Sequence, residues 1–120
     1  GVLVSVTGVK RDLGEGCGLP EKEGREYVIL TVVITNYNYS GHIYYESWDF
    51  RMQNSRSEID LEDQTTLVSG ILSQDQSVTG TVVFSEPVGD KGLYFIYEPN
   101  PFHKENDIRF WIPSDGDSGA

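Results

Sequence analysis

The stretch YVILTVVITN, residues 27–36, decides the fold of this chain, because it is rich in β-branched residues and contains no run of helix formers. Its even-numbered positions from Val28 to Ile34 are all apolar, whereas its odd-numbered positions include Thr31 and Thr35. One face of the strand is therefore wholly apolar and the other is half polar, as in a strand of a two-layer β-sandwich. We expect residues 27–36 to form the central strand.

Stretches with strand-like alternation also occur before and after the central strand, and turn-forming residues separate them. A glycine-rich segment, residues 13–24, precedes the central strand, and residues 37–41 supply turn residues after it. These features predict an all-β chain, an immunoglobulin-like antiparallel β-sandwich of seven or eight strands. The expected strands are residues 2–9, 27–36, 42–53, 58–61, 77–85, 93–97 and 108–112.

The segment 42–53 contains the tryptophan that we expect at the centre of the core. Alternation places Tyr44 and Trp48 on the same inward face as the apolar residues near the end of this segment. Tyr45 falls on the opposite, outward face. Glu46 interrupts the apolar face, and because a buried carboxylate without a partner is costly, we expect it near the sheet edge.

A chain of 120 residues can hold one sandwich core and not two. We expect the sandwich to occupy residues 1–113. Residues 114–120 contain no apolar residue except Ala120 and are predicted to be a disordered tail or a linker stub. Because Cys17 is the only cysteine, an internal disulfide is excluded and the fold must depend on packing.

The charge balance excludes one class of partner. Nine Lys and Arg residues against 19 Asp and Glu residues give a net charge of −10. Such a surface repels phosphate backbones, so we expect no nucleic acid partner. The sequence has no transmembrane run and starts almost directly in strand-like residues. Such a start is what a processed or truncated chain would have, and we expect that an N-terminal signal or lipid-anchored segment of an exported, extracellular or cell-surface protein has been removed upstream of it.

Loops of an immunoglobulin-like sandwich alternate between its two ends, so loops 37–41 and 98–107 should share one end. The loops 13–24, 54–57 and 86–91 should share the other. Aromatic residues gather at the first end, where they could stack on a sugar or contact a protein. The alternative, that the rings only cap the sandwich, stays open. The predicted binding residues are Tyr37, Tyr39, Tyr45 and Phe102.

Both histidines fall in or beside the same two loops. His42 and His103, with Glu46 nearby in the sequence, could hold zinc or another divalent ion, because two imidazoles and a carboxylate form a common ligand set. The alternative is that both histidines are solvated surface residues.

Catalytic motifs are missing from the sequence. It contains no Gly-x-Ser-x-Gly elbow, no phosphate-binding glycine loop and no His-Glu-x-x-His motif. We therefore expect neither an enzyme nor a bound cofactor.

Three features carry a resemblance to a known family: the strand 27–36 that closes on Asn36, the residue Phe50, and the segment LSQDQSVTGTVVFSEP at residues 72–87. From residue 2 to residue 113 the chain resembles secreted immunoglobulin-like (telokin-like) domains of unknown function. These domains occur in bacterial and archaeal lipoproteins and are related to the mycobacterial immunoprotective extracellular antigen. The chain departs from the family pattern at the turn after Gln53, which lacks a glycine, and at Asp75, which stands where a turn glycine is usual.

The resemblance implies an extracellular or membrane-anchored sandwich and supplies no catalytic residue. Together with the residue patterns it predicts a non-enzymatic extracytoplasmic interaction or adhesion module that binds a protein or a glycan. The alternative is a small-ligand or divalent-metal-binding domain that uses His42, His103 and nearby carboxylates. Because edge strands of an open sandwich can pair between chains, we expect a monomer or a weak dimer.

Overall fold

The computed structural model describes residues 1–100 and 102–113, so the predicted tail, residues 114–120, lies outside the described residues. Within the described residues the chain forms ten strands and three short 3-10 helices. The strands are β1 (Val2–Asp12), β2 (Arg25–Asn36), β3 (Ile43–Glu46), β4 (Phe50–Gln53), β5 (Ile59–Leu61), β6 (Gln64–Thr65), β7 (Ser69–Leu72), β8 (Ser77–Pro87), β9 (Tyr94–Tyr97) and β10 (Ile108–Trp111). The 3-10 helices are η1 (Glu15–Cys17), η2 (Ser47–Asp49) and η3 (Lys104–Asn106).

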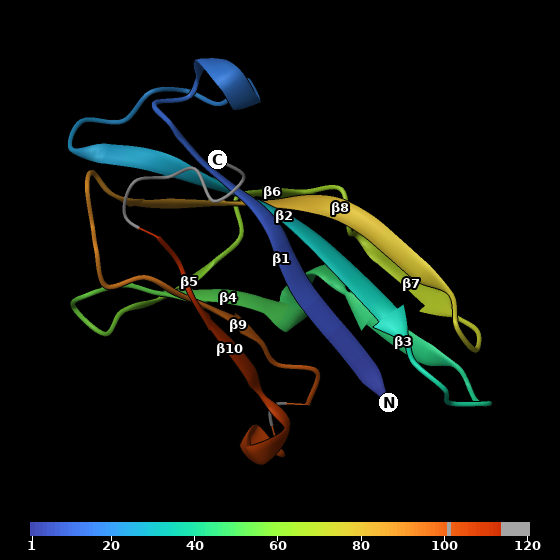
Figure 1. Cartoon of the computed structure of the whole chain (residues 1–120). Helices are drawn as coiled ribbons and strands as arrows, with labels where there is room; N and C mark the ends of the chain where they lie inside the picture. Colours follow the sequence, from blue (N-terminus) through green and yellow to red (C-terminus); the bar gives the residue numbers. More distant parts are fainter. Residues whose placement is uncertain (101, 114–120) are drawn as a thin grey trace.

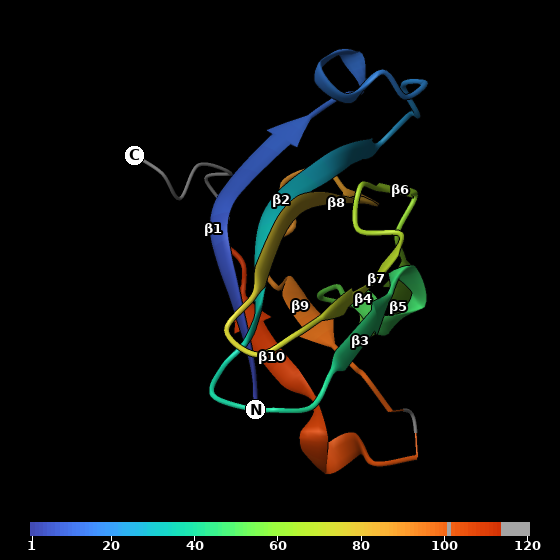
Figure 2. The same cartoon turned by 90° about the vertical axis from the view of Figure 1, so that its right-hand side faces the viewer.

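The strands form two four-stranded antiparallel sheets and a two-stranded ribbon. The first sheet has the order β1-β2-β8-β6, the second has the order β10-β9-β4-β5, and β3 pairs with β7 in the ribbon. The two sheets pack against each other, and the ribbon lies beside the second sheet (Figures 1 and 2). The predicted all-β sandwich is confirmed. No helix in the described part of the chain is long and apolar enough to cross a membrane.

The strand count exceeds the predicted seven or eight for two local reasons. The stretch 42–53 is expected to be one strand, but η2 divides it into β3 and β4, which lie in different sheets. The region after residue 57 then contributes the short strands β5, β6 and β7, of which the alternation pattern predicts only the first.

Strand β2 is the central strand that the sequence predicts. It pairs with β1 on one side and with β8 on the other. The side chains of Val28, Leu30, Val32 and Ile34 are all fully buried, because they face the second sheet. The apolar face of residues 27–36, from which the fold is predicted, therefore forms the part of the core that the first sheet contributes.

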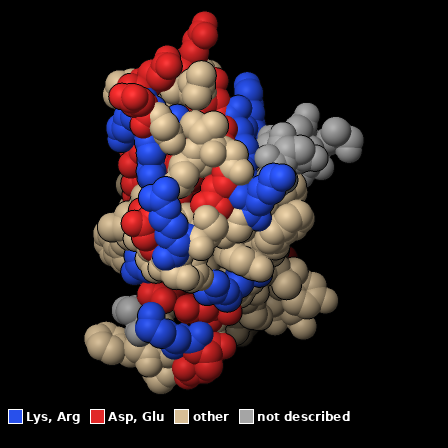
Figure 3. All heavy atoms as spheres, turned by 90° about the vertical axis from the view of Figure 1, so that its left-hand side faces the viewer, with Lys and Arg blue, Asp and Glu red and all other residues tan. Residues whose placement is uncertain are grey.

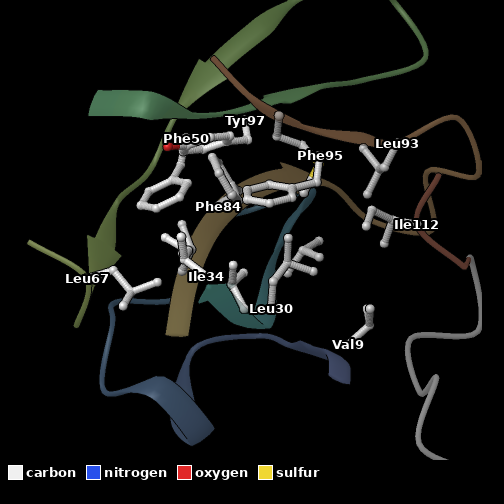
Figure 4. Close-up of a cluster of buried hydrophobic side chains, with 14 of the residues drawn as sticks. Val9, Leu30, Ile34, Phe50, Leu67, Phe84, Leu93, Phe95, Tyr97 and Ile112 are labelled. Carbon is white, nitrogen blue, oxygen red and sulfur yellow. The ribbon is translucent and has the colours of Figure 1, made fainter. Parts of the chain in front are cut away.

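Aromatic rings close the core between the two sheets. Phe84 of β8 meets Phe95 of β9 edge to face at 6.1 Å between ring centroids, and Phe50 of β4 stacks on Phe95 at 5.9 Å. Figure 4 shows these rings meeting above the aliphatic side chains of β2. Aromatic pairs in this geometry add about 0.5–1.5 kcal/mol each beyond their area burial.

For the first half of segment 42–53, the prediction of which side chains face the core is wrong. Trp48, expected at the core centre, is 62% exposed, and Tyr44 is 64% exposed, whereas Tyr45 is only 8% exposed. The cause is η2, where the side chain of Asp49 accepts a hydrogen bond from the backbone N–H of Glu46 at 3.0 Å and the Glu46 side chain caps Asp49 in return. This reciprocal capping ends β3 and resets the alternation before Phe50, which is buried as expected.

Candidate functional site

The β2–β3 loop, residues 37–42, is held by the asparagine that ends the central strand. Asn36 is fully buried, and its Nδ2 donates hydrogen bonds to the carbonyl oxygens of Gly41 at 2.9 Å and Leu72 at 3.1 Å. The side chain thus joins the loop to the end of β7. Because buried amides need such partners, Asn36 sets the path of the loop.

Asp75 ties the β7–β8 turn to the same loop. Its backbone N–H donates to the carbonyl of Asn36 at 2.7 Å, and its Oδ1 accepts from the N–H of Asn38 at 3.0 Å. Asp75 has a φ of 62°, in the left-handed region that aspartate tolerates better than most residues. Asp75, which stands where the resembled family usually has a turn glycine, therefore preserves the turn and adds a side-chain hydrogen bond that glycine cannot form.

The loop and the ribbon next to it present a surface rich in aromatic side chains. Tyr37 and Tyr39 are 59% and 49% exposed, and Tyr44 on β3 lies opposite Ile71 on β7 with both side chains more than half exposed. We call Tyr37, Tyr39, Tyr44 and Ile71 the β3 aromatic surface. Tyr45, which the sequence assigns to the binding surface, lies instead in the core, where its ring crowds Gly70.

Phe102, the fourth predicted binding residue, is 90% exposed on the β9–β10 loop. Figures 1 and 2 show this loop at the same end of the sandwich as the β2–β3 loop, as expected from the strand order. In the described residues no hydrogen bond or ion pair joins the two loops.

Glu98 anchors the β9–β10 loop to the second sheet. Its carboxylate accepts from Lys104 Nζ at 3.1 Å and from Arg51 Nε at 3.3 Å. Lys104 and Arg51 outweigh the effect of burial and lower the pKa of Glu98. Asp107 next to it shows the opposite shift, since burial and the neighbouring Glu98 raise its pKa.

The structure does not assemble the predicted metal ligands. His42 is exposed on the β2–β3 loop, His103 pairs with Glu105 at 3.0 Å, and Glu46 caps η2. Among residues 1–100 and 102–113, no group of three or more His, Cys, Asp or Glu side chains is arranged to hold a metal ion. Cys17 is a free thiol in the η1 turn.

An open pocket of about 590 Å³ lies on the outer face of the second sheet, away from the aromatic loops. Its walls come from the end of β4, the turn that follows it, and the strands β9 and β10. No pattern in the sequence predicts this pocket, because its residues belong to segments that are far apart in the chain. Its lining includes Gln53, Ser55, Ser57, Gly92, Tyr94 and Arg109.

A pair of carboxyl groups lies between the sheets. Glu86 on β8 is fully buried, and neither of its carboxyl oxygens has a hydrogen-bond partner among the described residues. Asp60, the inward residue of β5, has one similarly unpartnered oxygen. Burial, then the neighbouring Asp60, raises the pKa of Glu86 to about 9. The alternation of Glu86 with Val82 and Phe84 is the sequence signal that identifies it as inward-facing.

The structure buries Tyr45 and exposes Tyr44, the reverse of what the sequence pattern predicts. The free energy of unfolding of substituted variants tests this assignment. We expect Tyr45→Ser to lower the free energy of unfolding by about 2 kcal/mol, because the buried ring leaves a cavity at the margin of the core. Tyr44→Ser, the matched control at an exposed position, should change it by no more than about 0.5 kcal/mol. Urea unfolding of both variants measures the difference. Equal costs would contradict the burial of Tyr45.

The fold is similar to two solved structures from Bacillus subtilis. One is described as a "putative lipoprotein (ycdA)", with a TM-score of 0.71 and 19% identity, over 95% of this chain and 37% of that one. The other is the yjhA protein, with a TM-score of 0.54 and 21% identity, over 91% of this chain and 86% of that one. This chain thus spans little more than a third of the lipoprotein. At these identities the likeness shows the fold alone.

The sequence comparisons identify a family and give no sign of catalysis. No curated protein matches the sequence. A family model, "Domain of unknown function (DUF4352)", matches residues 2–108, which is most of the chain. This chain therefore belongs to the DUF4352 family of domains of unknown function.

Proposed function

We propose that this domain is a non-enzymatic interaction module of an exported or cell-surface protein, and that it contacts a protein partner through the β3 aromatic surface. The observation that carries the proposal is the exposure of Tyr37, Tyr44 and Ile71, each more than half exposed on the β2–β3 loop and the ribbon. Exposed apolar groups of this kind mark contact sites, and tyrosine is enriched in protein interfaces.

A protein fits this surface better than a glycan. Sugars stack on aromatic rings, whereas the aliphatic side chain of Ile71 stands directly opposite Tyr44 in the ribbon register. Trp48 and Val68, both 62% exposed, continue the apolar character, and the N–H of Ser47 donates to the carbonyl of Val68 at 2.8 Å. The mixture of aromatic and aliphatic groups is typical of the apolar centre of an interface.

The extracytoplasmic location is part of the same proposal. It is supported by the likeness to a protein described as a lipoprotein and by the family match. The wider relation to telokin-like domains and to the mycobacterial antigen is also proposed, and the shared sandwich architecture supports it at the level of fold.

The proposal is tested with the immobilised domain and the secreted and envelope protein fractions of the source organism. A partner captured from these fractions is identified, purified and titrated against the domain. We expect the double variant Tyr37→Ser, Tyr44→Ser to weaken the affinity at least about tenfold, since interface tyrosines often carry much of the binding energy. Its unfolding should stay close to that of the wild type, because both residues are exposed.

The matched control is Leu13→Ser, Val88→Ser. These side chains are 51% and 57% exposed, and they directly follow β1 and β8 where these strands pair with the start of β2, away from the β2–β3 loop. The control variant should bind as the wild type does. Equal affinities of the tyrosine variant and the wild type, or the lack of any saturable partner in both fractions, would contradict the proposal.

A further inference from the structure

The pocket on the outer face of the second sheet contains an arginine that is positioned by neutral groups. Arg109 Nη2 donates to Gln53 Oε1, and the guanidinium lies 5.4 Å from the centroid of the Tyr94 ring. In the described residues, the ion pairs involve Arg11, Arg51, His103 and Lys104, so no carboxylate of this chain forms an ion pair with Arg109 there, although Asp107 lies near enough for the charge of Arg109 to act on its pKa.

This arrangement leaves most of the guanidinium free for a ligand. Arginine presents five N–H donors in a planar fork, and the bond to Gln53 engages only one terminal nitrogen. A carboxylate matches such a fork with two parallel hydrogen bonds. The Tyr94 ring and Gln53 hold the fork in place, which lowers the entropy cost of binding.

The opposite wall of the pocket is polar and held in position by Asp90. The Asp90 carboxylate accepts from the N–H and the hydroxyl of Ser55, at 3.1 and 2.9 Å, and from the N–H of Gly92 at 2.7 Å. These bonds join the β4–β5 turn to the β8–β9 turn. Gly92 is required for their close approach, because a Cβ there would lie 2.8 Å from the Cβ of Ser55.

Ser57 and Ser55 bring hydroxyl groups to this wall. Ser57 is exposed, and the Ser55 oxygen, which donates to Asp90, can still accept a hydrogen bond. Figure 3 shows the face on the left of Figure 1, where Lys and Arg side chains lie among the acidic ones despite the net charge of −10. At the pocket itself, Arg109 supplies the positive charge for a negative ligand.

We propose that this pocket binds a sugar acid, with its carboxylate on Arg109 and its hydroxyl groups on Ser55, Ser57 and Gln53. The volume of about 590 Å³ lies within the range of small-molecule sites. The ligand carboxylate supplies the negatively charged partner that the Arg109 guanidinium lacks within the described residues. The sugar hydroxyls supply hydrogen-bond partners for the polar wall. This site is separate from the β3 aromatic surface and does not depend on the proposed protein contact.

The test is an NMR titration of the ¹⁵N-labelled domain with D-glucuronate, D-glucose and acetate. We expect saturable shifts of the amides of Gly92, Tyr94 and Arg109 with glucuronate. Glucose, which lacks the carboxylate, and acetate, which lacks the hydroxyls, should bind at least about tenfold more weakly. Arg109→Gln and Arg109→Lys should both lose about tenfold or more in affinity, because neither side chain reproduces the fork.

The matched control is Arg56→Gln, which removes an exposed arginine of the β4–β5 turn that is not among the residues lining the pocket. It should bind glucuronate as the wild type does, and all three variants should unfold as the wild type does. Four outcomes would overturn the proposal: no saturable shift with glucuronate, equal affinity for glucose, equal affinity for acetate, or unchanged binding by Arg109→Gln.

Discussion

Replacing Phe95 with alanine is expected to lower the free energy of unfolding by about 3–5 kcal/mol, the largest loss that we predict for a single substitution. Phe95 is fully buried, and its ring lies 5.9 Å from Phe50 and 6.1 Å from both Phe84 and Phe110. It therefore joins the first sheet to the second at the centre of the core. Because small domains are stable by only about 5–15 kcal/mol, this loss should be plain in urea unfolding.

Trp48→Ala is the control for this experiment, since the sequence pattern predicts Trp48 as the central aromatic of the core. The structure has Trp48 62% exposed on η2. Its replacement should change the free energy of unfolding by no more than about 0.5 kcal/mol. A cost for Trp48→Ala as large as that for Phe95→Ala would contradict the division of segment 42–53 into two strands.

Glu86→Gln is expected to stabilise the domain at high pH and not at low pH. Burial and the neighbouring Asp60 raise the pKa of Glu86 from 4.5 to about 9, so the folded protein keeps a proton that the unfolded chain releases. The stability of the wild type should therefore fall as the pH rises from about 4.5 to about 9. Glutamine has no proton to lose, and its amide N–H is a donor that the unpartnered oxygen of Asp60 could accept.

The difference between variant and wild type should be close to zero near pH 4 and about 5 kcal/mol in favour of Glu86→Gln near pH 8, since each pH unit above the unfolded pKa of 4.5 corresponds to about 1.4 kcal/mol. Urea unfolding at several pH values measures it. Glu23→Gln, at an exposed position, is the control and should show no such trend. A pH-independent difference, or a less stable variant near pH 8, would show that Glu86 is not protonated in the folded state.

The central strand and the sandwich were predictable because each depends on local patterns. In β2 the alternation of apolar residues over 27–36 matches the observed burial of Val28, Leu30, Val32 and Ile34. The expected strand 77–85 ends one residue before Glu86, so this inward side chain was not predicted, although its alternation with Val82 and Phe84 indicates it. The alternation pattern also does not reveal which residue Glu86 meets, because Asp60 comes from a strand in the other sheet.

Segment 42–53 shows where such patterns fail. Its apolar alternation resumes after Glu46 at Trp48, yet the chain leaves the ribbon after Glu46 and enters the second sheet at Phe50. The 3-10 turn between them shifts the phase, so Tyr44 and Tyr45 exchange the roles that the sequence assigns to them. The proposed binding surface consequently keeps Tyr37 and Tyr39 as exposed residues and gains Tyr44 in place of Tyr45.

The sequence by itself therefore determined the fold class, the central strand and the end of the sandwich at which the aromatic loops lie. These properties follow from side-chain periodicity and turn residues, which act over a few neighbouring positions. The tertiary structure alone decided which tyrosine faces solvent, that Glu86 meets Asp60, and that Arg109, Gln53 and Tyr94 form one pocket. Each of these depends on which strands become neighbours, and that choice is made by packing between segments far apart in the chain.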